Sequence, residues 1–242
     1  LHPWDKSHLM IGYDFIFLMC IWIWFGTIFL KRGYSLQRTY ALSKLESAMM
    51  PAIQVGLLVL VVTAPAFIFF SQKGPGAMHA PWLISLAAGL VVGGLSQVSR
   101  LCTVGGFRDL FLFKKSILIF GYLAVLIGVF VVNISFGNFH LGFENQPIAH
   151  TDGLWNFLGM ALAGFCSVLL GGCPLRQLIM TGEGNSDSAV TVLGLAAGAA
   201  FAHNFGLAAS GAGPTLNGEI AVGVGFVVAL IIAILNTKRA NA

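Results

Sequence analysis

Apolar residues in this chain stand in long unbroken runs that are separated by short polar stretches. A membrane-spanning helix needs about 20 apolar residues, and segments of roughly this length can be read along the sequence. The seven segments are Leu9 to Leu30, Met50 to Phe70, Trp82 to Ser99, Ser116 to Phe136, Leu154 to Gly172, Ser188 to Ser210 and Gly218 to Leu235. A barrel strand would alternate apolar and polar residues, so these continuous runs predict helices.

The polar stretches between the runs are too short to form a soluble domain, and the composition agrees with a membrane protein. Hydrophobic residues make up 57% of the 242 residues and charged residues 9%, whereas soluble domains average about 25% charged residues. The mean hydropathy is +0.86. We predict an all-α, polytopic membrane helix bundle that forms a single transmembrane domain over residues 1–242 and is surrounded by the lipid bilayer.

The basic residues give the orientation of the chain. If the loops after the first, third, fifth and seventh segments face the cytoplasm, every Lys and Arg except Lys6 and Lys73 falls on that side. This distribution follows the positive-inside rule and predicts a cytoplasmic carboxy terminus. The net charge of +4 then reflects topology, and a nucleic-acid partner is not expected.

The chain begins with Leu1 and shows no signal peptide with a basic head and a small-residue cleavage site. By the charge pattern, this first residue lies outside the membrane. We therefore expect the chain to be the carboxy-terminal part of a larger membrane protein.

A weak internal repeat ends in a cysteine in both copies. The stretch that ends at Cys102 aligns with the stretch that ends at Cys173, and a glycine stands nine residues before each cysteine. The two repeat units cover about residues 82–115 and 154–187, and in each an apolar helix is followed by a short polar-tipped segment. Transporters are often built from duplicated units with discontinuous helices. We therefore expect short broken or re-entrant helices at the cysteine turns.

The second cysteine turn combines groups that attract an anion. Gly171 and Gly172 relax the end of one helix, and Pro174 suits the first position of the next because it lacks an amide hydrogen. Cys173 then stands at a helix start, where free backbone amides and the positive end of the helix dipole attract an anion. Arg176 adds a positive charge.

The first cysteine turn has the same parts in another order. Arg100 precedes Cys102, and Thr103, two glycines and Arg108 follow it. A thiol is a weak hydrogen-bond donor with a polarisable sulfur, which suits a large soft anion better than a hard phosphate. The substrate-binding candidates at the two turns are Cys102, Cys173, Arg100, Arg176, Thr103 and Gly172.

Other polar residues in the apolar segments allow two interpretations. His203 and Asn204 lie in the sixth segment, where polar groups either face a water pathway or form hydrogen bonds between helices. We keep both as substrate-binding candidates. Cys20 and Cys166 are interpreted as small apolar packing residues. No disulfide, metal site or cofactor is expected, because the cysteines do not pair by spacing and no tight cysteine-histidine cluster is present.

These turns resemble the YeeE/YedE family of sulfur-compound transporters, and most closely its YedE-like branch, which is proposed to handle selenium. The resemblance covers about residues 80–220. It rests on the motif Gly-Gly-Cys-Pro-Leu-Arg-Gln from Gly171 to Gln177, on Thr181 to Asn185, on Ser99 to Thr103 and on Ala202 to Phe205.

The resemblance implies a protein of the bacterial inner membrane whose turn cysteines lie near the narrowest part of a solute path. Carried over by position, Cys102 and Cys173 would pass the anion along by transient hydrogen bonds. A small cytosolic sulfur-carrier protein is the implied partner. The family also implies cysteine hairpins that dip partway into the membrane, whereas the charge pattern lets these segments cross it. A third turn cysteine is not found in this chain and could lie upstream of Leu1.

The leading hypothesis is a transporter or channel for small selenium- or sulfur-containing anions, such as selenite or a thiosulfate-like ion. The alternative is a membrane thiol redox relay or enzyme that uses Cys102 and Cys173, and a third is a subunit that only scaffolds partners. An enzyme is disfavoured because the chain shows no P-loop, dinucleotide or Ser-His-Asp signature. For a transporter we expect the two turn thiols to be reduced and too far apart to form a disulfide.

Overall fold

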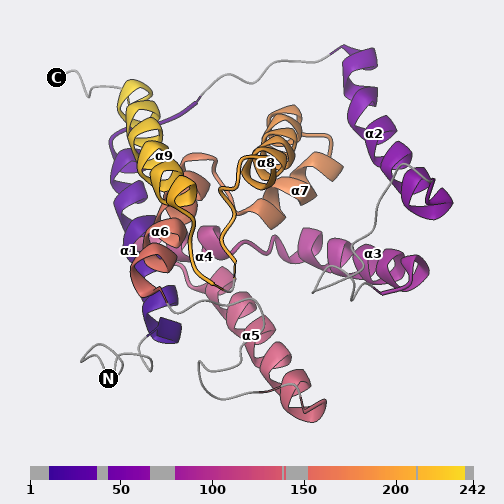
Figure 1. The fold of residues 1–242 in the computed structure, drawn as a ribbon, viewed down its shortest axis with the longest axis horizontal. Coiled ribbons are helices and arrows are strands. Elements are labelled where there is room, and N and C mark those ends of the chain that lie inside the picture. Colours follow the sequence, from indigo (N-terminus) through magenta and orange to yellow (C-terminus); the bar gives the residue numbers. More distant parts are fainter. Residues whose placement is uncertain are drawn as a thin grey trace.

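The computed structural model describes residues 11–36, 43–65, 80–137, 139, 152–210 and 212–237. In these residues the regular structure is helical, apart from isolated β-bridges between Tyr34 and Thr237 and between Ser210 and Gly213. The prediction of an all-α protein is confirmed (Figure 1).

Each of the apolar segments corresponds to a long helix. These helices are α1 (Ile11–Lys31), α2 (Lys44–Thr63), α3 (Trp82–Ser99), α5 (Ile117–Ser135), α6 (Gly153–Leu169), α8 (Ser186–Asn204) and α9 (Leu216–Leu235). Two short helices, α4 (Thr103–Phe113) and α7 (Pro174–Gly182), follow α3 and α6 directly after the cysteine turns. The prediction of broken helices at these turns is therefore confirmed.

Several of the helical stretches have the length and composition of membrane spans. The described residues contain four such stretches: Trp82–Phe113, Ile117–Ser135, Gly153–Gly182 and Leu216–Leu235. The first and third are the broken pairs α3–α4 and α6–α7. The chain is thus a multi-pass membrane protein, as predicted.

The packed centre of the molecule is built around α1, α4, α6 and α9. One cluster of buried residues joins α1, α4 and α6, and consists of Ile23, Cys102, Val104, Val168 and Cys173. A second cluster joins α6 and α9 to the end of α1 and contains Tyr34, Phe165, Leu169, Ala229 and Ala233. Helices in a membrane associate by such close packing, because lipid supplies no hydrophobic force between them.

Small residues permit the closest approach between α1 and α6. A Cβ added to Gly26 would lie 2.9 Å from the Cβ of Val168. Aromatic rings pack beside this contact, with the ring of Phe165 at 5.6 Å from Phe25 and 5.9 Å from Phe29. The α1–α6 pair is therefore held by shape rather than by polar contacts.

Helices α2, α3 and α5 extend away from this centre and expose apolar side chains. In Figure 1, α2 and α3 lie on the right and α5 points downward, away from α1, α6 and α9. Helix α5 has no buried residue, and α3 buries only Ser96. In a membrane such surfaces face lipid or other helices.

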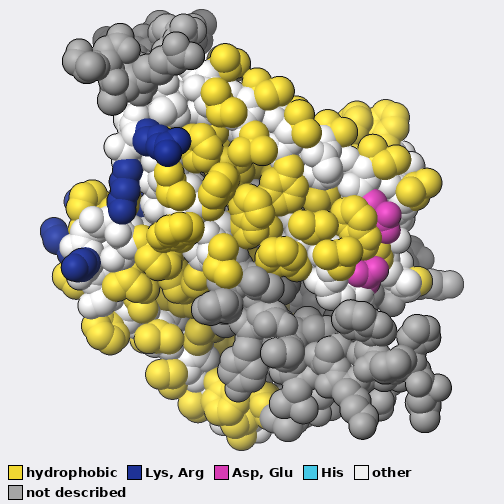
Figure 2. Space-filling model, turned by 90° about the vertical axis from the view of Figure 1, so that its left-hand side faces the viewer, with side chains coloured by type: hydrophobic (Ala, Val, Ile, Leu, Met, Phe, Trp, Pro, Cys, Tyr) yellow, Lys and Arg dark blue, Asp and Glu magenta, His cyan; other side chains and the backbone are white. Residues whose placement is uncertain are grey.

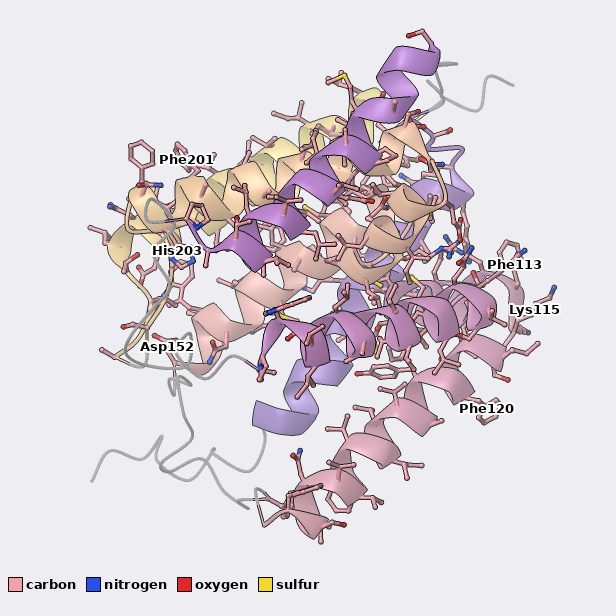
Figure 3. The ribbon with its side chains drawn as sticks, turned by 90° about the vertical axis from the view of Figure 1, so that its right-hand side faces the viewer. Phe113, Lys115, Phe120, Asp152, Phe201 and His203 are labelled. Atoms are coloured by element: carbon pink, nitrogen blue, oxygen red, sulfur yellow. The ribbon has the colours of Figure 1, made fainter. Side chains whose placement is uncertain are left out.

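On one face of the molecule, basic and acidic side chains lie apart from each other. In Figure 2, Lys and Arg side chains gather at one side of the visible face and acidic side chains at the other, with apolar side chains between them. Figure 3 shows the same separation, because Lys115 and Asp152 lie at opposite ends of the molecule. This arrangement is typical of a helix bundle that crosses a bilayer.

Candidate functional site at two helix breaks

The α3–α4 break places Cys102 at the start of a helix. Arg100 ends α3 in the left-handed conformation with φ 52°, and its backbone N–H bonds to carbonyls of the last turn. Cys102 is extended and is the N-cap of α4, where its Sγ accepts a hydrogen bond from the backbone N–H of Gly105 at 3.2 Å. A thiol thus does the capping that Ser or Asp usually performs.

The α6–α7 break places Cys173 in the same position. Gly171 turns the chain after α6 with φ +81°, a conformation that side chains disfavour. Cys173 is the N-cap of α7 and Pro174 is its first residue, as the sequence predicted, but the Cys173 side chain makes no capping hydrogen bond. The side chain of Gln177 donates to the Leu170 carbonyl at 2.9 Å and so ties α7 back to the end of α6.

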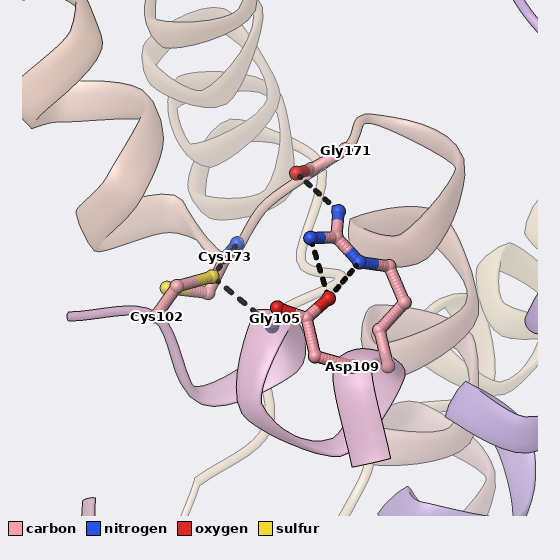
Figure 4. Close-up of polar contacts among 6 residues, drawn as sticks. Cys102, Gly105, Asp109, Gly171 and Cys173 are labelled. Atoms are coloured by element: carbon pink, nitrogen blue, oxygen red, sulfur yellow. Dashed lines mark hydrogen bonds and ion pairs between the residues drawn. The ribbon is translucent and has the colours of Figure 1, made fainter. Parts of the chain in front are cut away.

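The two breaks meet through their cysteines. The backbone N–H of Cys173 donates to Sγ of Cys102 at 3.4 Å, and the two thiol side chains lie next to each other (Figure 4). In return, the Cys173 thiol lies near the backbone N–H groups of Thr103 and Arg176. Each thiol therefore faces the amino-terminal end of its own short helix and of the other one.

This contact corrects one prediction. Cys102 and Cys173 are free thiols, but the expectation that they are too far apart to join is wrong, since the backbone nitrogen of Cys173 lies only 3.4 Å from Sγ of Cys102. The physical reason is the packing of α1 against both α4 and α6. Ile23 of α1 is fully buried between Val104 and Val168, and this brings the two breaks together.

Most of the candidate residues at the turns lie around this contact. Cys102 and Cys173 are buried, and Thr103 and Arg176 are partly exposed. The guanidinium of Arg176 pairs with Glu183 at 3.4 Å. Gly172 is buried, and a Cβ added to it would lie 3.2 Å from Cγ of Arg176. Arg100 contributes its backbone to the α3–α4 break, and its side chain is exposed.

His203 and Asn204 are not brought together with the thiols. Both are exposed at the end of α8, and His203 lies at the same end of the molecule as Asp152, opposite Lys115 (Figure 3). The side-chain amide of Asn204 donates to the Ala200 carbonyl within its own helix at 2.7 Å.

Sequence reasoning missed the site role of Arg108 and Asp109. Arg108 donates from Nε to Asp109 Oδ1 at 3.0 Å and from Nη1 to the Gly171 carbonyl at 3.4 Å (Figure 4). A residue of α4 therefore contacts the turn between α6 and α7. The adjacent Arg-Asp pair in α4 was the available signal, but nothing in the sequence shows that it reaches Gly171.

A cavity of about 270 Å³ lies away from this contact, between the first turns of α6 and α9 and the chain that joins α8 to α9. Its walls are mostly apolar, and they include Trp155, Gly159 and the carboxylate of Glu219. A negative charge disfavours anions, so the cavity does not compete with the cysteine contact as an anion site.

Two broken membrane helices whose amino-terminal ends converge define a class of membrane protein that handles a solute within the bilayer. The chain belongs to the sulphur transport family, the YeeE/YedE family, whose sequence profile matches residues 98–238. The match includes both cysteine turns, and it confirms the family resemblance. Comparisons with curated proteins and with solved structures returned no match. The protein is thus a membrane transporter of sulfur compounds.

Proposed function

We propose that the protein carries small anions that contain sulfur or selenium, such as thiosulfate or selenite, through the bacterial inner membrane past Cys102 and Cys173. The contact between the two thiols at the convergent starts of α4 and α7 is the observation that supports this proposal. Thr103, Gly172, Arg100 and Arg176 would surround the passage, and His203 and Asn204 would line the approach at the opposite end.

The chemistry of the contact favours a soft anion. The backbone N–H groups and dipoles of two helix starts make the region electropositive, and this attracts an anion. The thiols donate only weak hydrogen bonds and are polarisable. Weak, successive contacts let an ion leave as readily as it enters, which transport requires. Sulfur and selenium anions are both polarisable, so one site can serve both.

The charge distribution supports one orientation of the protein in the membrane. We place the basic end, which includes Lys115, in the cytoplasm together with the carboxy terminus, in keeping with the positive-inside rule. An anion that leaves at this end would meet positive charge. A small cytosolic sulfur-carrier protein is the proposed partner there. It would bind the sulfur that enters and so prevent its return through the protein.

Uptake into liposomes that contain the purified protein tests this proposal. We expect labelled thiosulfate or selenite to enter faster than sulfate or phosphate, since the last two are hard anions of similar charge. The relative rates of thiosulfate and selenite would identify the substrate branch. Equal slow entry of all four ions would contradict the proposal.

The direct contact between two free thiols favours a second candidate, a membrane redox relay. A relay must cycle between the dithiol and a Cys102–Cys173 disulfide, whereas a passage needs both thiols reduced. We expect active protein to contain the dithiol, and substrate to slow the labelling of the thiols by a maleimide. Active protein isolated with the disulfide, or labelling that no substrate slows, would favour the relay.

A further inference from the structure

All three guanidinium nitrogens of Arg108 make polar contacts. Nε and Nη2 both contact Oδ1 of Asp109, at 3.0 and 2.9 Å, and this leaves Nη1 to donate to the Gly171 carbonyl at 3.4 Å. Two contacts that converge on one oxygen restrict the rotation of the guanidinium, so the direction of the third nitrogen is restricted as well. Asp109 therefore orients Arg108 towards the second helix break.

The carbonyl that Arg108 contacts is suited to a positive charge. Gly171 follows the last turn of α6, where unpaired carbonyls carry the negative end of the helix dipole. Gly171 is also separated from Cys173 by a single residue. The Arg108 contact and the hydrogen bond from Cys173 to Cys102 thus form two links between the same pair of breaks.

We propose that Arg108, held by Asp109, is a positioning residue that keeps the Gly171 turn seated against the α3–α4 break and so sets the separation of the two thiols. Its effect on transport rests on the proposed function, whereas its effect on the thiol geometry does not. Arg32 offers a matched contrast, because it is an exposed arginine just after the end of α1 and no described contact of its side chain links the breaks.

The separation of the thiols is measured by the rate at which they form a disulfide. The oxidant diamide takes up the two hydrogens of Cys102 and Cys173 and becomes the hydrazine, and the two sulfurs join. The full chain is tested in liposomes with Cys20 and Cys166 replaced by serine. We expect Arg108→Gln to slow disulfide formation about tenfold, the loss expected for one charge-assisted hydrogen bond. Arg32→Gln should leave the rate of disulfide formation unchanged.

Two further variants keep the test decisive if Arg108→Gln does not insert. Arg108→Lys keeps the charge but lacks the fork, and we expect it to restore part of the rate. Asp109→Asn keeps the guanidinium but weakens its support, and we expect an intermediate rate. Disulfide formation at the parent rate in Arg108→Gln would overturn the proposal. If Arg108→Gln does not insert into the membrane, the parent rate in both Arg108→Lys and Asp109→Asn would overturn it.

Uptake by the same variants separates this inference from the proposed function. The position of the Gly171 turn affects how fast the anion passes the two thiols. We therefore expect Arg108→Gln to lower the maximal uptake rate by a larger factor than it changes the half-saturating anion concentration. If Arg108→Gln slows disulfide formation while neither it nor the parent protein transports an anion, the positioning role stands and the proposed function fails. Unchanged uptake together with an unchanged disulfide rate would remove the positioning role alone.

Discussion

The two helix breaks share a design but differ in how the rest of the molecule supports them. Helix α6 buries Ala161, Gly164, Phe165, Ser167, Val168 and Leu169. Helix α3 buries only Ser96, and the first break is held by the helix after it, since α4 buries Val104, Gly105 and Gly106. Two similar turns can thus keep the same local geometry while the second is anchored through the helix before the break and the first through the helix after it.

The local chemistry of the two cysteines differs in the same way. Sγ of Cys102 caps its own helix through the N–H of Gly105, whereas Cys173 relies on Pro174 at the first helical position and makes no capping hydrogen bond. Cys102 therefore has a structural task in addition to its contact with Cys173. Variants that separate these two tasks test the comparison.

The largest effect is expected on transport. Cys102→Ala and Cys173→Ala should each lower uptake of the labelled anion by about tenfold or more, because each removes one of the hydrogen-bonding groups at the contact. Membrane expression should persist. Cys20→Ala is the control, since no described contact joins Cys20 to the thiol pair, and its uptake should match the parent. Equal, small effects of all three changes would exclude passage by way of the thiols.

The next effect concerns the contact between α1 and α6, the helix that precedes the second break. A Cβ at Gly26 would lie 2.9 Å from Val168, so Gly26→Val should force α1 and α6 apart and cost about 1–3 kcal/mol. Gly128→Val in α5 is the control, because nothing lies within 4 Å of a Cβ there. Thermal unfolding in detergent measures both. An equal loss of stability in both variants would mean that the α1–α6 contact does not contribute more to stability than an exposed position in α5.

Sequence reasoning predicted the helices well and their contacts poorly. Helix α3 begins and ends at the predicted residues, Trp82 and Ser99, because hydrophobic runs and helix-end signals are local in the chain. The contact between Cys102 and Cys173 depends on the packing of α1 between α4 and α6, which no local pattern contains. The reach of Arg108 to Gly171 likewise spans 63 residues and follows from tertiary structure alone.

A smaller effect is expected on the stability of the protein, and it should differ between variants of the two cysteines. Cys102→Ala should lower stability by about 1 kcal/mol through loss of the α4 cap, while Cys173→Ala loses no capping bond. Cys102→Ser should recover the stability, because serine is a good N-cap, but should not recover uptake of a soft anion. Thermal unfolding and uptake on the same preparations measure both properties. Full uptake by Cys102→Ser would show that a hydroxyl suffices and that the polarisable sulfur is unimportant.

The smallest effect concerns Tyr34, which belongs to the α6 side of the comparison through its contact with Phe165 and Leu169. Its hydroxyl is buried and has no hydrogen-bond partner among the described residues. Burial raises the pKa of Tyr34 above its ordinary value of 10.0, and the nearby Cys166 adds to this. The folded protein therefore holds the phenol proton more tightly than the unfolded chain does.

Because the pKa is raised, this contribution to stability is complete below pH 10 and is lost as the pH rises further. We expect Tyr34→Phe to flatten the fall in stability above that pH and to raise stability near neutrality by up to about 1 kcal/mol, since an unpaired buried hydroxyl is removed. Unfolding temperatures measured across the alkaline range test both effects, with Tyr122→Phe as the control for loss of a phenol hydroxyl elsewhere. An identical alkaline profile for Tyr34→Phe and the parent would contradict a raised pKa of Tyr34 in the folded protein.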